Sequence, residues 1–450
     1  MESPLTFDEV LAELSRALVF GIHPSLEGVT ALCRVLGDPQ DSFASVQITG
    51  TNGKSSTARA TAALLGAQGG VVGLYTSPEL ERYPERMEIG GKVVSDEEFA
   101  RGVSAALYAA RELRGADAVG TDTGFTEFEL LTAAALWLFR ERGVDAAVLE
   151  VGMGGRWDAT SIVSPVVSAI TGVGLDHMAI LGDTVQAIAA EKAAIVRAGS
   201  IPVLGPGTVG VEEVFLERAR SAGVPARAVR PDGDPSPVDE ALTVRYSVVR
   251  RPDRPGGQTV VDVTGVHASY PGLAVGAPSY QAANVATAVA IAEAALGGPL
   301  DLSASREALG VLTFPGRFEL VRVAPPILVD GSHNPQAAAV LAQAVCEAFP
   351  EGRPALLLGV LAEKDARGIV AALAPVVSDI VITQPVSRRA LSADLLAEVV
   401  EEVTGTPPAA VYDSLPDALS KPIPGASVGL VITGSLTTAG QARQVLREMG

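Results

Sequence analysis

Residues 50 to 56 have the types and the spacing of a turn that binds phosphate. They are Gly50-Thr51-Asn52-Gly53-Lys54-Ser55-Ser56, after the apolar run 46–48 and before a helix expected over 55–65. In such a turn the backbone N–H groups and the helix N-terminus face the anion, lysine adds positive charge, and a serine hydroxyl can reach Mg²⁺. The usual motif has four residues between its first glycine and Gly-Lys. Here there are two, so a glycine-rich turn with a solvated lysine is the alternative.

Three further candidates follow other strands expected in the same part of the chain. Glu150 closes an apolar strand and precedes glycines, and a carboxylate there suits Mg²⁺, which prefers oxygen ligands. Ser77 and His177 come shortly after two more strands. Ligands of open α/β sheets bind beyond the carboxyl ends of the strands, so these side chains are expected at one edge. The alternatives are a surface carboxylate, a serine in a turn before Pro78 and a structural histidine.

The second half of the chain and one helix of the first half supply more candidates. Asp330 and His333 lie where an expected strand gives way to a helix, and they can bind phosphate or metal or simply cap that helix. Arg317 can hold a phosphate with two N–H groups, or lie on the surface. Lys192 falls inside a helix expected over 184–198. By sequence alone it is better explained as a solvated helix lysine.

The elements that must position these residues alternate between strand and helix. Such alternation predicts an α/β fold with mainly parallel sheets. In the first part we expect strands 46–48, 71–75, 146–150, 166–171 and 202–204, and helices 55–65, 96–113, 126–140, 184–198 and 282–296. Segments 242–249 and 259–268 predict an antiparallel hairpin at the edge of that sheet.

A second alternating series begins near residue 314. We expect strands 327–329, 355–358, 380–383 and 429–433, and helices 335–348, 366–374, 393–403 and 439–449. The pattern predicts a smaller, doubly wound, Rossmann-like domain at the C-terminus. The boundary is expected within 298–316, and we place it between residues 312 and 313. The predicted domains are therefore 1–312 and 313–450.

The overall composition argues against several classes of protein. The 450 residues carry a formal net charge of −18, which argues against a nucleic-acid partner. Two cysteines, Cys33 and Cys346, lie far apart in sequence and suit a reducing cytosol. The N-terminus has no basic region leading into an apolar core, and no run of 18 apolar residues occurs. We therefore expect a cytoplasmic protein with no membrane partner.

Taken together, the motifs resemble the folylpolyglutamate synthase/dihydrofolate synthase family of the Mur ligase superfamily. The most specific motif is the run Glu-Val-Gly-Met-Gly-Gly-Arg-Trp-Asp-Ala-Thr over residues 150–160. The resemblance covers nearly the whole chain, and the short glycine spacing in the phosphate turn is the superfamily's own form. Other matching segments, in chain order, are Leu36–Pro39, Gly50–Ser56, Tyr75–Pro78, Gly174–His177, Glu191–Ala193, Phe314–Arg317 and Asp330–Pro335.

The resemblance implies a role for each candidate residue. Lys192 matches a lysine that is carbamylated in the superfamily, which reverses the preference for a solvated side chain. The ATP site would comprise Gly50, Thr51, Asn52, Gly53, Lys54, Ser55 and Ser56, completed across the domain interface by Asn284, Arg317, Asp330 and His333. One Mg²⁺ would be bound by Ser77 and Glu150, and a second by Glu150 and His177. The catalytic residues would be Lys54, Lys192, His177 and Arg317, and the substrate-binding residues Arg156 and Asp158.

The activity implied is that of an ATP-dependent amide ligase. A pteroate or folate carboxylate would attack the γ-phosphate of ATP, and the amine of glutamate would displace phosphate from the acyl phosphate. Residues 1–312 would be the ATP-binding central domain, the partners would be small molecules, and the protein would be a monomer. Three alternatives are a Mur ligase acting on a cell-wall nucleotide precursor, a P-loop nucleotide switch and a catalytically silent binding protein.

Four positions depart from the family's pattern. Glu79 stands where histidine is common and adds negative charge near the metal-binding loop, which bears on pterin binding and on the metal. Ser55, Ser161 and Ala194 stand where glycine, asparagine and glycine are common. None of the four removes a proposed metal or phosphate group. The sequence does not distinguish a dihydrofolate synthase from a folylpolyglutamate synthase or from an enzyme with both activities.

Overall fold

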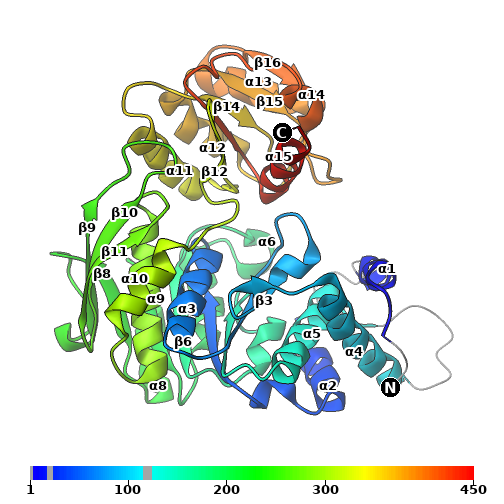
Figure 1. The fold of residues 1–450 in the computed structure, drawn as a ribbon, viewed down its shortest axis with the longest axis vertical. Coiled ribbons are helices and arrows are strands. Elements are labelled where there is room, and N and C mark those ends of the chain that lie inside the picture. The colour runs from blue at the N-terminus through cyan, green and yellow to red at the C-terminus, as the bar shows by residue number, and fades with distance from the viewer. Residues whose placement is uncertain (1–3, 18–23, 115–123, 450) are drawn as a thin grey trace.

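The computed structural model describes residues 4–17, 24–114 and 124–449, and within these ranges the strands form two sheets. Figure 1 shows the second sheet, coloured yellow to red, lying above the first. The first sheet is large and mainly parallel, and the second is smaller. This arrangement confirms the predicted fold class.

The first sheet places the phosphate turn at its centre. Strands pair in parallel from β9 through β1 to β2, and antiparallel strands complete the two ends. In pairing order they are β11 (Ser269–Val275), β10 (Thr259–Thr264), β9 (Thr243–Arg250), β8 (Arg227–Pro231), β7 (Ile201–Gly207), β6 (Val167–Gly172), β1 (Ala44–Thr49), β5 (Ala146–Glu150), β2 (Val72–Tyr75), β3 (Met87–Ile89) and β4 (Lys92–Val93).

Helices cover both faces of this sheet because the buried strands are apolar on both. Val46 and Ile48 pack toward one helix layer, whereas Ala147 and Leu149 pack toward the other, as the alternation of side chains along a strand requires. The first layer is α3 (Lys54–Ala67), α9 (Gln281–Leu296) and α10 (Leu302–Gly310). The second is α1 (Phe7–Ala17), α2 (Glu27–Val35), α4 (Asp96–Arg114), α5 (Glu127–Glu141), α7 (Val185–Lys192) and α8 (Glu212–Ala222). No helix in the described ranges has the length and apolar character needed to cross a bilayer.

The second sheet is also doubly wound. Its order is β12 (Glu319–Val323), β13 (Pro326–Val329), β17 (Leu430–Thr433), β14 (Ala355–Leu358), β15 (Ile380–Thr383) and β16 (Ala410–Tyr412), parallel except between β12 and β13. Helices α11 (Pro335–Ala348), α12 (Ala366–Leu373) and α13 (Ala393–Thr404) cover one face. Helices α14 (Leu415–Leu419) and α15 (Leu436–Met449) cover the other.

The expected domain boundary falls in the connection between the two sheets. Helix α10 ends at Gly310 and β12 begins at Glu319, so the strands of the two sheets lie on either side of residues 312 and 313. The division into domains 1–312 and 313–450 stays a prediction.

Several elements differ from those expected. The predicted hairpin is present, but 259–268 is not one strand: β10 ends at Thr264, and β11, which was not predicted, forms the edge. Strand β8 was missed because two of its five residues, Arg227 and Arg230, are buried arginines that break the apolar pattern. The short β3–β4 hairpin was also missed, although Gly90-Gly91 between its strands is a turn signal. The helix expected over 184–198 is α7, followed by one short 3₁₀ turn.

A buried glutamate ties α9 to the antiparallel end of the first sheet. Glu293 is fully buried, and its carboxylate accepts hydrogen bonds from the backbone N–H groups of residues 266–268 and from the Tyr270 hydroxyl. Arg227 Nη1 of β8 lies 3.8 Å from Glu293 Oε2. The carboxylate therefore accepts the hydrogen bonds of a turn and of a phenol, and it partly compensates the charge of a buried arginine.

We expect Glu293→Ala to lower the free energy of unfolding by about 3–5 kcal/mol, because it leaves several buried hydrogen-bond donors and a buried arginine without their acceptor. Glu293→Gln keeps one acceptor oxygen and is expected to lose less. Urea denaturation measures both changes. Glu307→Ala, at an exposed position of α10, is the matched control. A loss below about 1 kcal/mol in Glu293→Ala, the size of an ordinary single hydrogen bond, would contradict this account.

Candidate active site

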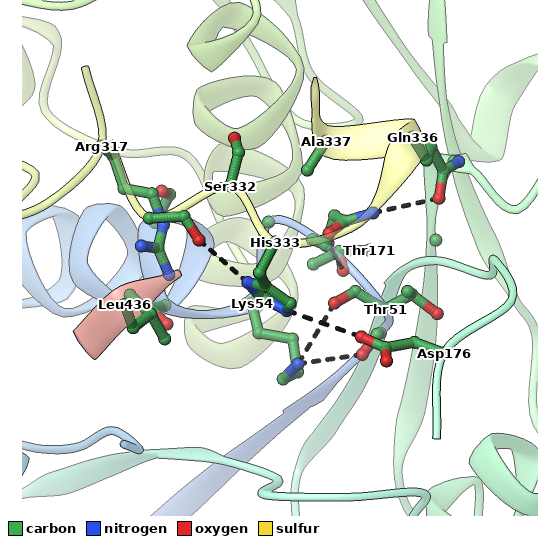
Figure 2. Close-up of a pocket in the computed structure, with 18 of the residues that line it drawn as sticks. Thr51, Lys54, Thr171, Asp176, Arg317, Ser332, His333, Gln336, Ala337 and Leu436 are labelled. Atoms are coloured by element: carbon green, nitrogen blue, oxygen red, sulfur yellow. Dashed lines mark hydrogen bonds and ion pairs between the residues drawn. The ribbon is translucent and has the colours of Figure 1, made fainter. Parts of the chain in front are cut away.

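One cavity of about 550 Å³ lies where the carboxyl ends of the central strands of the first sheet face the second sheet. Figure 2 shows residues of both sheets pointing into it. Of the predicted site residues, its lining includes Gly50, Thr51, Asn52, Gly53, Lys54, Ser55, Ser56, Ser77, Glu150, His177, Lys192, Asn284, Arg317, Asp330 and His333. Segments distant in sequence are thus brought together at one place.

The phosphate turn depends on a glycine directly before α3. Gly53 has φ of 83°, a left-handed conformation that side chains disfavour. A Cβ atom there would also lie 2.6 Å from Asn284 Oδ1 of α9. The chain can therefore turn sharply from β1 into α3, with the helix N-terminus at the cavity.

Hydrogen bonds fix the turn against the end of β6. The Thr51 N–H donates to the Gly172 carbonyl at 2.9 Å, and the Thr171 hydroxyl donates to the Asn52 carbonyl at 2.6 Å. Lys54 Nζ donates to the Gly50 carbonyl at 3.1 Å and to the Thr51 carbonyl at 3.4 Å. The lysine is thus held over the turn, where a bound phosphate can replace a neutral carbonyl as the acceptor of its hydrogen bond.

Asn284 is held by side chains of both α3 and α9. Its Oδ1 accepts a hydrogen bond from the Thr57 hydroxyl at 3.3 Å, and its Nδ2 donates to Gln281 Oε1 at 2.7 Å. Gln281 in turn donates to the Ser56 hydroxyl at 3.1 Å. Ser56 is therefore engaged by α9, and Asn284 has a fixed position at the cavity wall.

Glu150 is a buried carboxylate with no cation in direct contact among the described residues. The residue is only 1% exposed. Its Oε1 accepts a hydrogen bond from the Ser55 hydroxyl at 2.9 Å, and its Oε2 accepts one from the Ser77 N–H at 3.3 Å. Burial raises the pKa of Glu150, while Lys54 and the two serine donors oppose that rise. A bound divalent cation would supply the missing compensation, so the residue fits a metal site. The surface alternative for Glu150 is wrong.

His177 and Asp176 form a short segment that faces the second sheet. His177 has φ of 52°, a left-handed conformation, directly before the short helix α6 (Met178–Leu181). Asp176 Oδ1 accepts from Lys364 Nζ at 2.7 Å, and Oδ2 lies 3.5 Å from His333 Nε2. Burial acts to raise the pKa of Asp176, but contacts with His333 and Lys364 outweigh it and hold that pKa well below its usual range. Asp176 is therefore an anionic link between the sheets.

Lys192 is buried, which overturns the solvated-lysine interpretation from sequence alone. The residue is 3% exposed at the end of α7, and its Nζ donates to the Gly50 carbonyl at 3.0 Å. Burial, and then repulsion from Lys54, lowers the pKa of Lys192 to about 7. A substantial neutral fraction is therefore present near neutral pH. The sequence could not reveal this burial, because Gly50 lies 142 residues away.

Arg317 lies on the turn before β12, and His333 lies on the loop between β13 and α11. Phe318 has φ of 49°, and its N–H donates to Asp330 Oδ2 at 2.8 Å. Asp330 also accepts from the Ser332 N–H at 2.8 Å, so its carboxylate shapes the loop beside the cavity. The residue that caps α11 is Asn334, whose side chain accepts from the Ala337 N–H, and not Asp330 or His333. Arg317 lines the cavity from this loop.

The unusual Glu79 is neutralised within its own segment. Its carboxylate bonds Arg86 Nε, and Arg86 is buried. Glu79 does not line the cavity that contains Ser77. The added negative charge is thus paired away from the candidate metal residues.

The segment after Ser77 also contacts the last helix of the chain. A Cβ atom on Gly440 of α15 would lie 1.9 Å from the Leu80 carbonyl oxygen, so only glycine allows this approach. Glu81 pairs with Arg443 at 3.0 Å and with Arg447 at 2.8 Å. Helix α15 therefore holds the segment that carries Ser77.

Two predicted substrate residues lie outside the cavity lining. Arg156 pairs with Glu191 at 3.1 Å and is partly exposed. Asp158 is buried, where it accepts from the Met153 and Thr160 N–H groups and so fixes the glycine-rich loop. Their assignment to substrate binding stays a prediction.

Comparison with known proteins agrees with this geometry. Residues 48–202 match the Mur ligase middle domain, and residues 316–435 match the Mur ligase glutamate ligase domain. A Mycobacterium tuberculosis protein named dihydrofolate synthase/folylpolyglutamate synthase is 35% identical over 94% of this chain and 90% of its own length. This chain belongs to the folylpolyglutamate synthase/dihydrofolate synthase family.

Solved structures of the folylpolyglutamate synthase/dihydrofolate synthase family have the same fold. The M. tuberculosis folylpolyglutamate synthase complexed with ADP has a TM-score of 0.85 at 34% identity, over 98% of both chains. The E. coli protein FolC in complex with DHPP and ADP has a TM-score of 0.82 at 27% identity, over 100% of this chain and 99% of that one. The names of the relatives and the ADP bound in these structures identify an ATP-dependent ligase.

Two contacts of this family member were not predicted as site features. Lys364, which meets Asp176, follows the carboxyl end of β14, and that placement is the signal that could have identified it. Ser55 was assigned to the phosphate turn, but its bond to Glu150 was not foreseen. It depends on how β1, α3 and β5 pack.

We expect Lys192→Met to raise the free energy of unfolding at pH 6 in CO₂-free buffer by roughly 2 to 4 kcal/mol, because it removes a buried charge whose pKa is depressed. Above the folded-state pKa of about 7 the folded amine is neutral while the unfolded lysine stays charged up to its ordinary pKa. The free energy of unfolding of the wild type therefore increases as the pH rises above about 7. The difference in free energy of unfolding between Lys192→Met and the wild type becomes smaller.

Urea denaturation at pH 6 and pH 9 measures this narrowing. Lys92→Met, at an exposed position of β4, is the control and is expected to change little at either pH. A Lys192→Met protein less stable than the wild type at pH 6 would contradict the interpretation.

Proposed function

We propose that this chain joins the amine of L-glutamate to a carboxylate of a pteroate or folate at the expense of ATP. Relatives matched over nearly their whole length are named dihydrofolate synthase/folylpolyglutamate synthase. The observation that carries the proposal is a single cavity where a phosphate-binding turn faces a buried carboxylate and a buried lysine. No side chain needs to act as a nucleophile in this reaction.

ATP would bind with its phosphates on the turn Gly50–Ser56. The N-terminus of α3 and Lys54 offer N–H groups and positive charge there. Asn284, which lies beside Gly53, and Arg317 with the loop Asp330–His333 would complete the nucleotide site, since all of them line the same cavity.

Two Mg²⁺ ions are proposed beside the phosphates. Ser77 and Glu150 would hold one, and Glu150 and His177 the other, and all three residues line the cavity. A divalent cation here would neutralise charge on the phosphate oxygens. The donor set is rich in oxygen, as Mg²⁺ prefers. Among the described residues, no group of three or more His, Cys, Asp or Glu side chains is placed to hold a metal ion, so nucleotide oxygens and water would have to complete the coordination.

Lys192 is proposed to carry a carbamate. The neutral amine attacks the carbon of CO₂, an N–C bond forms as one C=O π bond opens and its electron pair moves to oxygen, and the nitrogen loses one proton to solvent. The lowered pKa supplies the neutral amine, and the product exchanges a buried cation near Lys54 for an anion. That anion would sit at the cavity wall, where it can compensate Lys54 and a second cation.

The carbamate is expected to appear in protein equilibrated with ¹³CO₂. One carbamate carbon signal should be seen by ¹³C NMR, and it should be absent in Lys192→Met. At fixed CO₂ pressure the signal should grow from pH 6 to pH 8, because the neutral fraction rises through the pKa of about 7. A signal of equal size in the variant would remove the assignment, and so would its absence in the wild type.

The chemistry has two displacement steps. A carboxylate oxygen of the pterin substrate attacks the γ-phosphorus, the bond to the β–γ bridging oxygen breaks, and ADP leaves. The glutamate nitrogen then attacks the acyl carbon, the bond to phosphate oxygen breaks, and the nitrogen loses a proton. Lys54 and Arg317 would compensate the charge that gathers around the γ-phosphate. Because the site lies between two sheets, closure would exclude water from the acyl phosphate.

The remaining assignments are also proposals. Residues 1–312 would act as the ATP-binding domain and 313–450 as its smaller partner. We propose a cytoplasmic monomer whose partners are small molecules. Arg156 and Asp158, both on the glycine-rich loop after β5, are proposed to bind the substrate.

Purified protein is expected to release ADP only when Mg²⁺, glutamate and a pterin are all present. Turnover with dihydropteroate alone would identify a dihydrofolate synthase. Turnover with tetrahydrofolate alone would identify a folylpolyglutamate synthase, and turnover with both an enzyme with two activities. Lys54→Met should abolish release, because it removes the cation of the phosphate turn.

The same assay separates the competing functions. Turnover with a cell-wall nucleotide precursor but not with pterins would assign a Mur-type ligase. ADP release that does not depend on glutamate would indicate a nucleotide switch. Either result would overturn the proposal.

A further inference from the structure

The hydroxyl of Ser55 makes a contact that the phosphate-binding role does not require. It donates a hydrogen bond to Glu150 Oε1 at 2.9 Å, and this bond connects α3 with the end of β5. We propose that Ser55 is a positioning residue, which orients the Glu150 carboxylate for a divalent cation. The inference rests on the metal site proposed above.

The orientation of Glu150 depends on few groups. Its hydrogen bonds come from the Ser55 hydroxyl and, at 3.3 Å, from the Ser77 N–H. Lys54 Nζ donates instead to carbonyls of the phosphate turn, at 3.1 and 3.4 Å. The shorter of the two bonds to Glu150, and the only one from a side chain within the described residues, is therefore that of Ser55.

A hydrogen bond from Ser55 does not block a cation. Each carboxylate oxygen has about two lone-pair sites, so Oε1 can accept from Ser55 and still face a metal ion. Groups that hydrogen-bond a metal ligand fix its orientation, and their loss typically lowers metal affinity about 10- to 100-fold. Ser55 stands in that relation to Glu150.

The neighbouring serine has a different partner. Ser56 is buried, and its hydroxyl accepts from Gln281 of α9 at 3.1 Å. Ser55 is half-buried at the second residue of α3 and lines the cavity. The helix therefore directs one serine to its packing partner and the other to the carboxylate.

A merely structural role for Ser55 makes a different prediction. Alanine is the better helix former, so a serine that only completes α3 could be replaced without loss of metal binding. If Ser55 instead positions Glu150, removal of its hydroxyl would weaken the binding of Mg²⁺, and threonine at the same position would restore that binding.

The test measures ADP binding with excess Mg²⁺ and with EDTA by isothermal titration calorimetry. The ratio of the two Kd values reports how strongly metal and nucleotide support each other. Ser55→Ala is expected to reduce this ratio about 10-fold; a change in nucleotide binding that does not involve the metal would alter both Kd values alike and leave the ratio as it is. Ser55→Thr should keep most of the ratio, and Ser221→Ala, on an exposed position of α8, should keep all of it. Thermal unfolding by circular dichroism verifies that each variant is folded.

An unchanged or larger ratio in Ser55→Ala would overturn the positioning role, and so would a fall that Ser55→Thr fully shares. The wild type provides the separate check on the proposed function. If it bound no ADP under either condition, the proposed nucleotide site would fail, and the role of Ser55 with it. Binding of ADP with equal ratios in wild type and Ser55→Ala would sink only the role of Ser55.

Discussion

Charge buried at the carboxyl edge of the central strands is the constraint on which the rest of this molecule depends. Glu150 and Lys192 are both almost completely buried, yet they do not bond each other; each is met by neutral groups, serine donors for one and the Gly50 carbonyl for the other. Burying an uncompensated ion costs several kcal/mol. At this edge the protein therefore buries two ionisable side chains without an opposite charge in contact with either, which the proposed metal ions and carbamate would compensate.

Local pattern was enough to predict the skeleton of the site. The run 46–48, the glycine turn and the helix after it are contiguous, so their roles as β1, turn and α3 could be inferred from order and residue type. The residues at the ends of the other parallel strands followed from the same rule, since the carboxyl ends of such strands meet at one edge. Gly53 is the clearest case, because both its backbone angle and its contact with Asn284 exclude a side chain.

What the sequence could not predict depends on partners far along the chain. The buried state of Lys192 is fixed by Gly50, and the burial of Arg227 in β8 by Glu293. In each case a charged residue on its own indicates a surface, and only the compensating group shows otherwise. The contact between the sheets has the same character: Asp176 takes Lys364 and His333 from segments more than 150 residues away. The periodicity of apolar residues in a sequence does not show which charged side chains will pair with each other in the folded chain.

The fit of Leu80 against Gly440 has a consequence for the order in which this protein is made. Helix α15 supplies Gly440, which lies against Leu80, and two arginines that pair with Glu81 in the segment after Ser77. Because the N-terminal part of a chain emerges from the ribosome first, strands β1 to β6 can be complete while that segment still lacks its support. The phosphate turn can thus form early in synthesis, whereas the segment after Ser77 gains its contacts with α15 only once residues 436–449 have been made.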